Sequence, residues 1–190
     1  MGERLVSSVQ ARETISTLLE SGDPDAIGTP PDWWTVKITR SDAEQGDCEA
    51  MYALGRWYGM GLMGLPEDQE QAYVWYERSA KQGHTDGLAK QGDLLFKGIG
   101  TTKNEAEGAI LLTMAAERGS HYGAFILGMA YYEGTPASSI RKDLDRAEYW
   151  LEKPLRNYFE WRHQFLKYLS VSNERTAHET LKEIKKEREG

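Results

Sequence analysis

Glycines recur at a fixed interval along this chain, and this repeat constrains its fold more than any other feature. The first series closes three similar phrases, AEQG, AKQG and AERG, at Gly46, Gly83 and Gly119, with spacings of 37 and 36 residues. A second glycine follows each of these after nine residues and a third after six more, which adds the series Gly55, Gly92, Gly128 and Gly61, Gly98, Gly134. Three series in step over three units predict a repeat architecture.

Each glycine series has its own physical reason. The first and the third follow helical runs, where a residue in the left-handed conformation closes a helix and glycine adopts that conformation without a Cβ clash. The middle series falls inside a helix, where glycine costs about 1 kcal/mol relative to alanine. We therefore expect another helix backbone to pack too close to Gly55, Gly92 and Gly128 for a side chain.

Each unit is expected to contain two helices. Asp47 is expected to cap the first helix of the first unit, and Pro66 to open the second one. In the second unit, Thr102-Lys103-Asn104-Glu105 is typical of a capping box. In the third unit, Ser120 is expected to cap the first helix. Pro154 should kink or end the second helix of that unit near Lys153.

The two flanks are less regular. Residues 11–42 resemble a degenerate copy of the repeat unit, with a helix that begins at Pro31-Asp32. The segment 155–169 has helical spacing, and the polar helix expected over 173–189 is typical of the cap that ends a solenoid. We therefore divide the chain into N-terminal helices in 1–42, three repeats in 43–154 (about 47–83, 84–119 and 120–154) and C-terminal capping helices in 155–190.

The repeat units resemble Sel1-like repeats, which are related to tetratricopeptide repeats and are common in bacteria. The segments that carry the resemblance are AMYALGRWY at 50–58, AYVWYERSAKQG at 72–83, Leu127-Gly128 and AEYWLEK at 147–153. The chain departs from the family pattern at Gly87, Gln91, Gly123 and Pro154. The resemblance implies an all-α fold, a right-handed α-solenoid of antiparallel helix pairs whose first helices line a concave, protein-binding face. It also implies an adaptor, scaffold or regulator, although a few members are described as hydrolases.

No pattern in the chain predicts catalysis, a cofactor or a metal site. His84 and His121 occupy equivalent places in successive units, about 10 Å apart if neighbouring helices pack normally, which is too far for one metal ion. We interpret both as solvated turn residues. The chain also lacks a nucleophile elbow, a phosphate-binding loop and a His-Glu-x-x-His segment. We therefore expect no enzyme activity, no cofactor and no metal ion.

The charge of the chain restricts its partners. Its net charge is −7, and residues 41–153 carry 18 acidic and 11 basic side chains, which accounts for the whole difference. Such a body repels nucleic acid and would steer a protein with a basic surface toward it. Without a membrane-spanning stretch or a secretory signal in the sequence, we expect a cytoplasmic protein that does not bind membranes. The oligomeric state stays open, with a monomer as the simplest expectation.

A candidate partner-binding stripe lies on the first helices, on the face expected to point away from the core. Aromatic, Met and Arg side chains, which protein interfaces enrich, make up most of it. Its members are Tyr52, Arg56, Asp93, Phe96, Phe125, Met129 and Tyr132. An alternative is that Phe125 and Tyr132 pack on neighbouring helices. A second candidate surface lies in 155–169 and includes Trp161, Tyr168, Arg156, Arg162 and Lys167, unless that segment is a packed lid.

The sequence therefore predicts a non-catalytic adaptor or regulator that binds another protein on a concave face. One alternative is an immunity protein or inhibitor that neutralises a basic toxin, because an acidic helical surface would complement it. The other alternative, from a different class, is a small hydrolase.

Overall fold

The computed structural model describes residues 32–134, 140–156 and 171–189 of the 190-residue chain. The described residues form helices and connecting turns, with no strand among them. The helices, in chain order, are α2 (Asp32–Glu44), α3 (Cys48–Met60), α4 (Gln69–Lys81), α5 (Thr85–Lys97), α6 (Glu105–Glu117), α7 (His121–Glu133), α8 (Leu144–Arg156) and α10 (Val171–Glu189).

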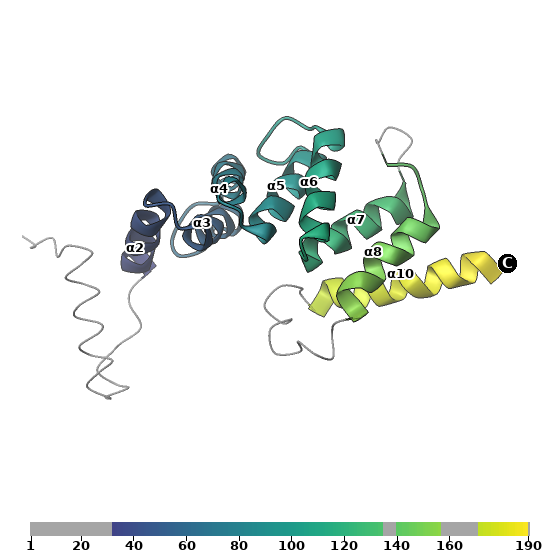
Figure 1. The fold of residues 1–190 in the computed structure, drawn as a ribbon. Coiled ribbons are helices and arrows are strands. Elements are labelled where there is room, and N and C mark those ends of the chain that lie inside the picture. Colours follow the sequence, from purple (N-terminus) through teal and green to yellow (C-terminus); the bar gives the residue numbers. More distant parts are fainter. Residues whose placement is uncertain (1–31, 135–139, 157–170, 190) are drawn as a thin grey trace, which may run out of the picture.

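The helices follow one another across the molecule as a stack of pairs (Figure 1). α3 packs on α4, α5 on α6 and α7 on α8, while α4 and α6 each contact the first helix of the next pair. The core is correspondingly divided into clusters along the stack, and Leu54, Leu112 and Leu127 are among the fully buried side chains of successive pairs. This architecture is an all-α repeat solenoid, as the glycine spacing predicts.

Helix caps explain where the first helix of each pair begins. The Asp47 carboxylate accepts hydrogen bonds from the backbone N–H groups of Glu49 and Ala50, and Ser120 Oγ accepts one from Gly123. Both caps were expected from the sequence. At the equivalent place in the second pair, the cap is His84, whose ring Nδ1 accepts from the backbone N–H of Gly87 at 2.8 Å. His84 is therefore a structural residue, and its interpretation as a solvated turn residue is wrong.

Two of the helix starts expected from the sequence are displaced. α4 begins at Gln69 with Asp68 as its cap, so Pro66 lies in the preceding turn. α6 is capped by Asn104, whose side chain accepts from the backbone N–H of Glu107 and donates to its carboxylate. Asn104 and Glu107 thus take the places expected for Thr102 and Glu105, but no reciprocal capping box forms, because the backbone N–H of Asn104 donates to the carbonyl of Leu95. In both cases a later Asp or Asn satisfies the free N–H groups of the first turn.

Pro154, which is expected to kink or end its helix near Lys153, lies close to the end of α8. α8 continues from Leu144 to Arg156 and so passes through this position. A proline interrupts a helix by removing one N–H donor and crowding the carbonyl four residues earlier. These effects fall on the turn before Pro154, and α8 ends shortly after it, at Arg156.

The glycine series confirm the expected turns and modify the expected packing. Gly46, Gly83 and Gly119 have φ values of +100°, +92° and +98°, in the left-handed region. Within the helices, a Cβ on Gly92 would lie 3.0 Å from the carbonyl oxygen of Gly108, which is the backbone contact expected. At Gly55, however, the space is filled by the ring of Tyr76, 2.7 Å from the position of such a Cβ.

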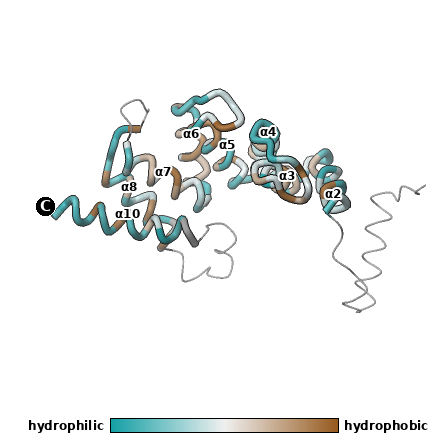
Figure 2. Tube along the Cα trace, turned by 180° about the vertical axis from the view of Figure 1, so that it is seen from behind, coloured by the Kyte–Doolittle hydropathy of each residue, from teal (hydrophilic) through white to brown (hydrophobic). Residues whose placement is uncertain are grey.

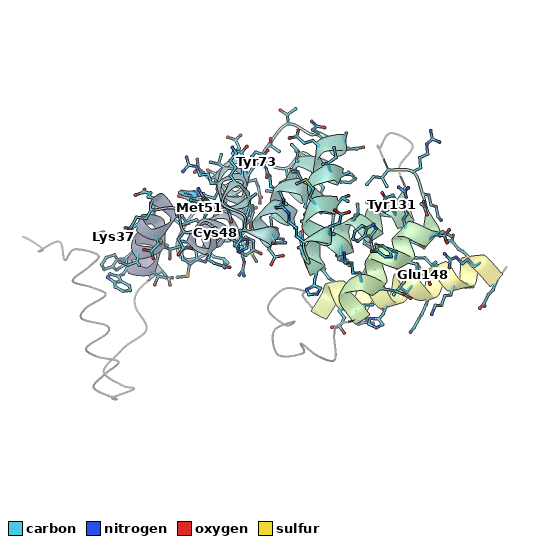
Figure 3. The ribbon with its side chains drawn as sticks, viewed as in Figure 1. Lys37, Cys48, Met51, Tyr73, Tyr131 and Glu148 are labelled. Carbon is cyan, nitrogen blue, oxygen red and sulfur yellow. The ribbon has the colours of Figure 1, made fainter. Side chains whose placement is uncertain are left out.

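The C-terminal helix closes the described end of the stack. α10 packs on both α7 and α8, and its narrow apolar stripe buries Ala177 and Ile184 against Phe125 and Leu151. Figure 2 shows that the rest of α10 is predominantly hydrophilic. Ion pairs join Arg188 to Glu148 on α8, and Glu148 lies where α8 meets α10 in Figure 3.

Some sequence expectations lie outside the described residues. These are the degenerate repeat in 11–31 and most of the helix expected in 155–169, including Trp161, Arg162, Lys167 and Tyr168. The helix expected from Pro31-Asp32 onward is present as α2, which buries Ala43 against α3.

Candidate functional site

A groove of about 360 Å³ runs across the first helices of the three pairs. We call it the α3–α5–α7 groove. From α3 it is lined by Glu49, Tyr52, Arg56 and Met60. The cap of α5 and α5 itself contribute His84, Asp86 and Lys90. Tyr122 comes from α7 and Asn173 from α10. The groove thus draws on residues far apart in the sequence, which only the stacking of the units brings together.

The wall between α3 and α5 is built around His84. Its ring stacks on Tyr52 with 4.6 Å between the centroids, and Tyr52 also contacts the ring of Tyr76. Because His84 Nδ1 accepts the capping hydrogen bond, Nε2 carries the proton and lies 3.1 Å from the Glu49 carboxylate. The capping hydrogen bond, the ring stack and the contact with the carboxylate together hold His84 in a single orientation. Its side chain is only 9% exposed.

The wall between α5 and α7 is built around Tyr122. Its hydroxyl donates a 2.6 Å hydrogen bond to Asp93 Oδ2, and the ammonium group of Lys90 lies 3.6 Å from the centre of its ring. Asp93 is 5% exposed, and its other carboxylate oxygen lies 2.7 Å from Lys97 Nζ, which supplies the opposite charge. A buried carboxylate is tolerated here because it has both a cation and a hydroxyl donor.

Burial shifts the ionisation of several groups at the groove. It raises the pKa of Tyr122, and the neighbouring Asp93 carboxylate raises it further. Burial lowers the pKa of Lys90, and the positive charges of Lys97 and Arg56 add to the decrease, against the opposing effect of Asp93 and Asp86. Burial also lowers the pKa of His121, which Asp86 partly opposes.

The stripe expected from the sequence faces the next helix of the stack. Tyr52 on α3 contacts His84, the cap of α5, and Asp93 on α5 contacts Tyr122 on α7. Phe96 packs on the cluster that contains Ala124 and Leu127 of α7. The stripe is therefore mainly a packing face between successive units.

In the third unit the helix that covers the stripe is α10. Phe125 is 6% exposed and belongs to the core cluster with Ala177 and Ile184. Met129 Sδ accepts a hydrogen bond from Thr180 at 3.7 Å, and the Tyr132 hydroxyl donates to Glu183 at 2.9 Å. The expectation that the stripe points away from the packed interior is thus wrong for Asp93 and Phe125, and the alternative of packing on a neighbouring helix describes Phe125 and Tyr132.

Two of the seven stripe residues line the groove, and these are Tyr52 and Arg56. Most of the other groove residues lie outside the stripe, at different positions of the first helices. Glu49, Asp86 and Tyr122 each lie six residues before the middle glycine of their unit. This position, in step over three units, is the sequence signal that identifies the groove.

Within residues 32–134, 140–156 and 171–189, no three His, Cys, Asp or Glu side chains are grouped so that they could hold a metal ion. In the same ranges, no helix combines the length and the hydropathy needed to cross a bilayer.

Comparison with known proteins identifies the repeat. A family model described as Sel1 repeat matches three consecutive segments, residues 48–84, 87–120 and 121–153. The chain belongs to the Sel1 repeat family. Each matched Sel1 repeat contains one helix pair: α3 with α4, α5 with α6 and α7 with α8.

The relatives that contain these Sel1 repeats are much longer proteins. The chain is 29% identical over 121 residues to chitin synthase regulatory factor 2 of Schizosaccharomyces pombe, a match that covers 63% of this chain and 23% of that protein. It is 31% identical over 112 residues to the ERAD-associated E3 ubiquitin-protein ligase component HRD3B of Arabidopsis thaliana, covering 58% and 17%. The chain therefore spans less than a quarter of either relative.

A solved structure supports the Sel1 fold. The Sel1 repeat protein from Oxalobacter formigenes superimposes with a TM-score of 0.56 at 23% identity, over 78% of this chain and 63% of that one. Identity at this level shows the shared solenoid fold and nothing about a shared ligand.

Proposed function

We propose that this Sel1 repeat protein is a non-catalytic adaptor or regulator that binds a partner protein in the α3–α5–α7 groove, on the concave side of the solenoid. The groove is the single observation that carries the proposal. It combines aromatic surface from Tyr52 and Tyr122 with the charges of Arg56 and Lys90, and Tyr and Arg are prominent among the residues that dominate binding energy at protein interfaces.

The relatives support a role in regulation rather than in chemistry. One is named as a regulatory factor of chitin synthase and another as a component of a ubiquitin ligase. Of the seven stripe residues expected from the sequence, we propose Tyr52 and Arg56 as partner-binding residues. Tyr52 also contacts His84 and Tyr76, but it lines the groove, whereas the other five (Asp93, Phe96, Phe125, Met129 and Tyr132) do not. The net charge of −7 would still favour a partner whose overall surface is basic.

Site-specific photo-crosslinking tests the proposal. A photoreactive amino acid would replace Tyr52 in the groove or, as the matched control, Tyr149, which is 54% exposed on α8. In host cells, we expect a defined protein to be crosslinked from position 52 and not from position 149. Mass spectrometry then identifies this protein.

The purified partner allows a direct measurement. Isothermal titration calorimetry should show weaker binding to Tyr52→Ala and to Arg56→Ala, and unchanged binding to Tyr149→Ala. The opposite pattern would contradict the proposal. So would hydrolytic turnover by the pure protein that a groove substitution abolishes.

A further inference from the structure

The charged groups of the groove differ in the direct partners that the chain itself gives them. Both acidic side chains are engaged, since Glu49 lies against His84 and Asp86 accepts a 2.7 Å hydrogen bond from Ser120 Oγ. Among the described residues, neither Arg56 nor Lys90 has a carboxylate within ion-pair distance. The groove therefore carries two positive charges without a direct carboxylate partner, although Asp93 and Asp86 act on Lys90 from a greater distance.

Lys90 is the more costly of the two charges. It is half-buried and its ammonium group lies over the ring of Tyr122, which compensates the lost hydration only in part. Burial lowers its pKa, Asp93 partly opposes this decrease, and the positive charge of Arg56, which lines the same groove, adds to it. A negative charge that arrives between them would relieve both effects.

We propose that the groove selects a segment of the partner protein in which an Asp or Glu side chain binds between Arg56 and Lys90 while an adjacent apolar side chain packs on Tyr52 and Met60. This inference rests on the proposed function and specifies the chemistry of the partner. Carboxylates accept short, strong hydrogen bonds from guanidinium and ammonium groups. Met60 is 62% exposed at the groove, so the site also offers apolar surface that a free anion would leave uncovered.

Selection from displayed random peptides tests this inference on the full chain. Enriched sequences would be synthesised with an acetylated N-terminus and an amidated C-terminus, so that only side chains supply charge. We expect the enriched peptides to share an Asp or Glu next to an apolar residue. Replacement of that residue by Asn or Gln should weaken binding by about tenfold or more, because a charge-assisted hydrogen bond is lost.

Variants of the protein test the same contact from the other side. Arg56→Gln and Lys90→Gln should each weaken binding of the acidic peptide by about tenfold, and have much less effect on its Asn or Gln form. Lys81→Gln is the matched control, because Lys81 is an exposed lysine on α4 that pairs with Glu77 outside the groove. The charge-conserving variants Arg56→Lys and Lys90→Arg should retain most of the affinity. Unchanged melting temperatures would exclude unfolding as the cause.

The possible failures are distinguishable. If peptides bind and Tyr52→Ala weakens them, but their acidic residue is dispensable, the groove binds a partner segment and the inference about charge is wrong. If the enriched peptides bind equally well to Tyr52→Ala, Arg56→Gln and Lys90→Gln, the groove is not the binding site, and the proposed function fails as well.

Discussion

The Tyr122 hydroxyl on α7 donates a 2.6 Å hydrogen bond to the buried Asp93 carboxylate on α5. This contact joins the first helices of two successive Sel1 repeats and lies directly beneath the α3–α5–α7 groove. Its stability therefore affects both the rigidity of the solenoid and the position of the Lys90 cation, which rests on the Tyr122 ring.

Removal of this hydroxyl should destabilise the protein. In Tyr122→Phe the Asp93 carboxylate would keep only Lys97 as a partner, and losing a hydrogen bond to a buried charge costs about 1.5–3 kcal/mol. Chemical denaturation would measure the change in the free energy of unfolding. The control is Tyr149→Phe, since Tyr149 is 54% exposed and should tolerate the change. Equal stabilities of the two variants would show that the Asp93 contact contributes nothing.

Two helical glycines should respond in opposite ways to substitution by alanine. A Cβ on Gly108 would lie 2.6 Å from the backbone nitrogen of Phe96, so Gly108→Ala forces α5 and α6 apart and should cost about 1–3 kcal/mol. A Cβ on Gly59 would meet only an ordinary contact at 3.4 Å from Ala72. Gly59→Ala should therefore stabilise the protein by up to about 1 kcal/mol, because alanine favours the helix.

Thermal unfolding would compare these two variants with the original chain. The close approach of α5 and α6 is contradicted if Gly108→Ala melts at or above the temperature of the unchanged protein.

The attachment of α10 should depend on Ile184. This side chain is fully buried against the cluster that contains Phe125, so Ile184→Ala should lose about 2–5 kcal/mol. Hydrogen exchange should increase first in α10, because the smaller buried side chain Ala177 and the exposed ion pairs that also hold this helix contribute less than Ile184. Lys185→Ala, at the adjacent exposed position, should leave exchange unchanged. Faster exchange in α3 and α4 but not in α10 would be inconsistent with this arrangement.

Alkaline pH should destabilise the protein through its buried tyrosines. Burial raises the pKa of Tyr76 above the ordinary value of 10.0, and the nearby Tyr52 adds to the increase. The raised pKa means that the folded state holds its proton where the unfolded state has lost it. The stabilisation is therefore complete below pH 10 and is lost as the pH rises further, by up to about 1.4 kcal/mol per pH unit for each such tyrosine.

Tyr76→Phe removes one of these protons and should make the decline in stability above pH 10 less steep. Urea denaturation at a series of alkaline pH values would measure both slopes. Identical slopes for the variant and the unchanged protein would mean that Tyr76 ionises as readily in the folded state as in the unfolded one.

The local sequence is sufficient to predict the repeat and most of its turns. The left-handed conformation at Gly46, Gly83 and Gly119 follows from the missing Cβ, and the caps at Asp47 and Ser120 follow from side chains that reach the first free N–H groups. Where two capping residues compete, as Thr102 and Asn104 do, the sequence alone did not decide between them. The choice depends on where the loop that follows α5 brings the chain to the start of α6, and this place is set by tertiary packing.

The sequence by itself determined the helix pairs and their repetition, because caps, glycine turns and apolar spacing act over a few residues. Only the tertiary structure decided which face of each first helix is open. Tyr52 and Phe125 occupy equivalent positions in their units, but each is covered by whatever element follows it in the stack, His84 for Tyr52 and α10 for Phe125. Asp93, one residue after the middle glycine of its unit, is covered by Tyr122. The physical reason is that a helical side chain's exposure depends on the rotation and offset between neighbouring units, and many residues distant in sequence together set these two quantities.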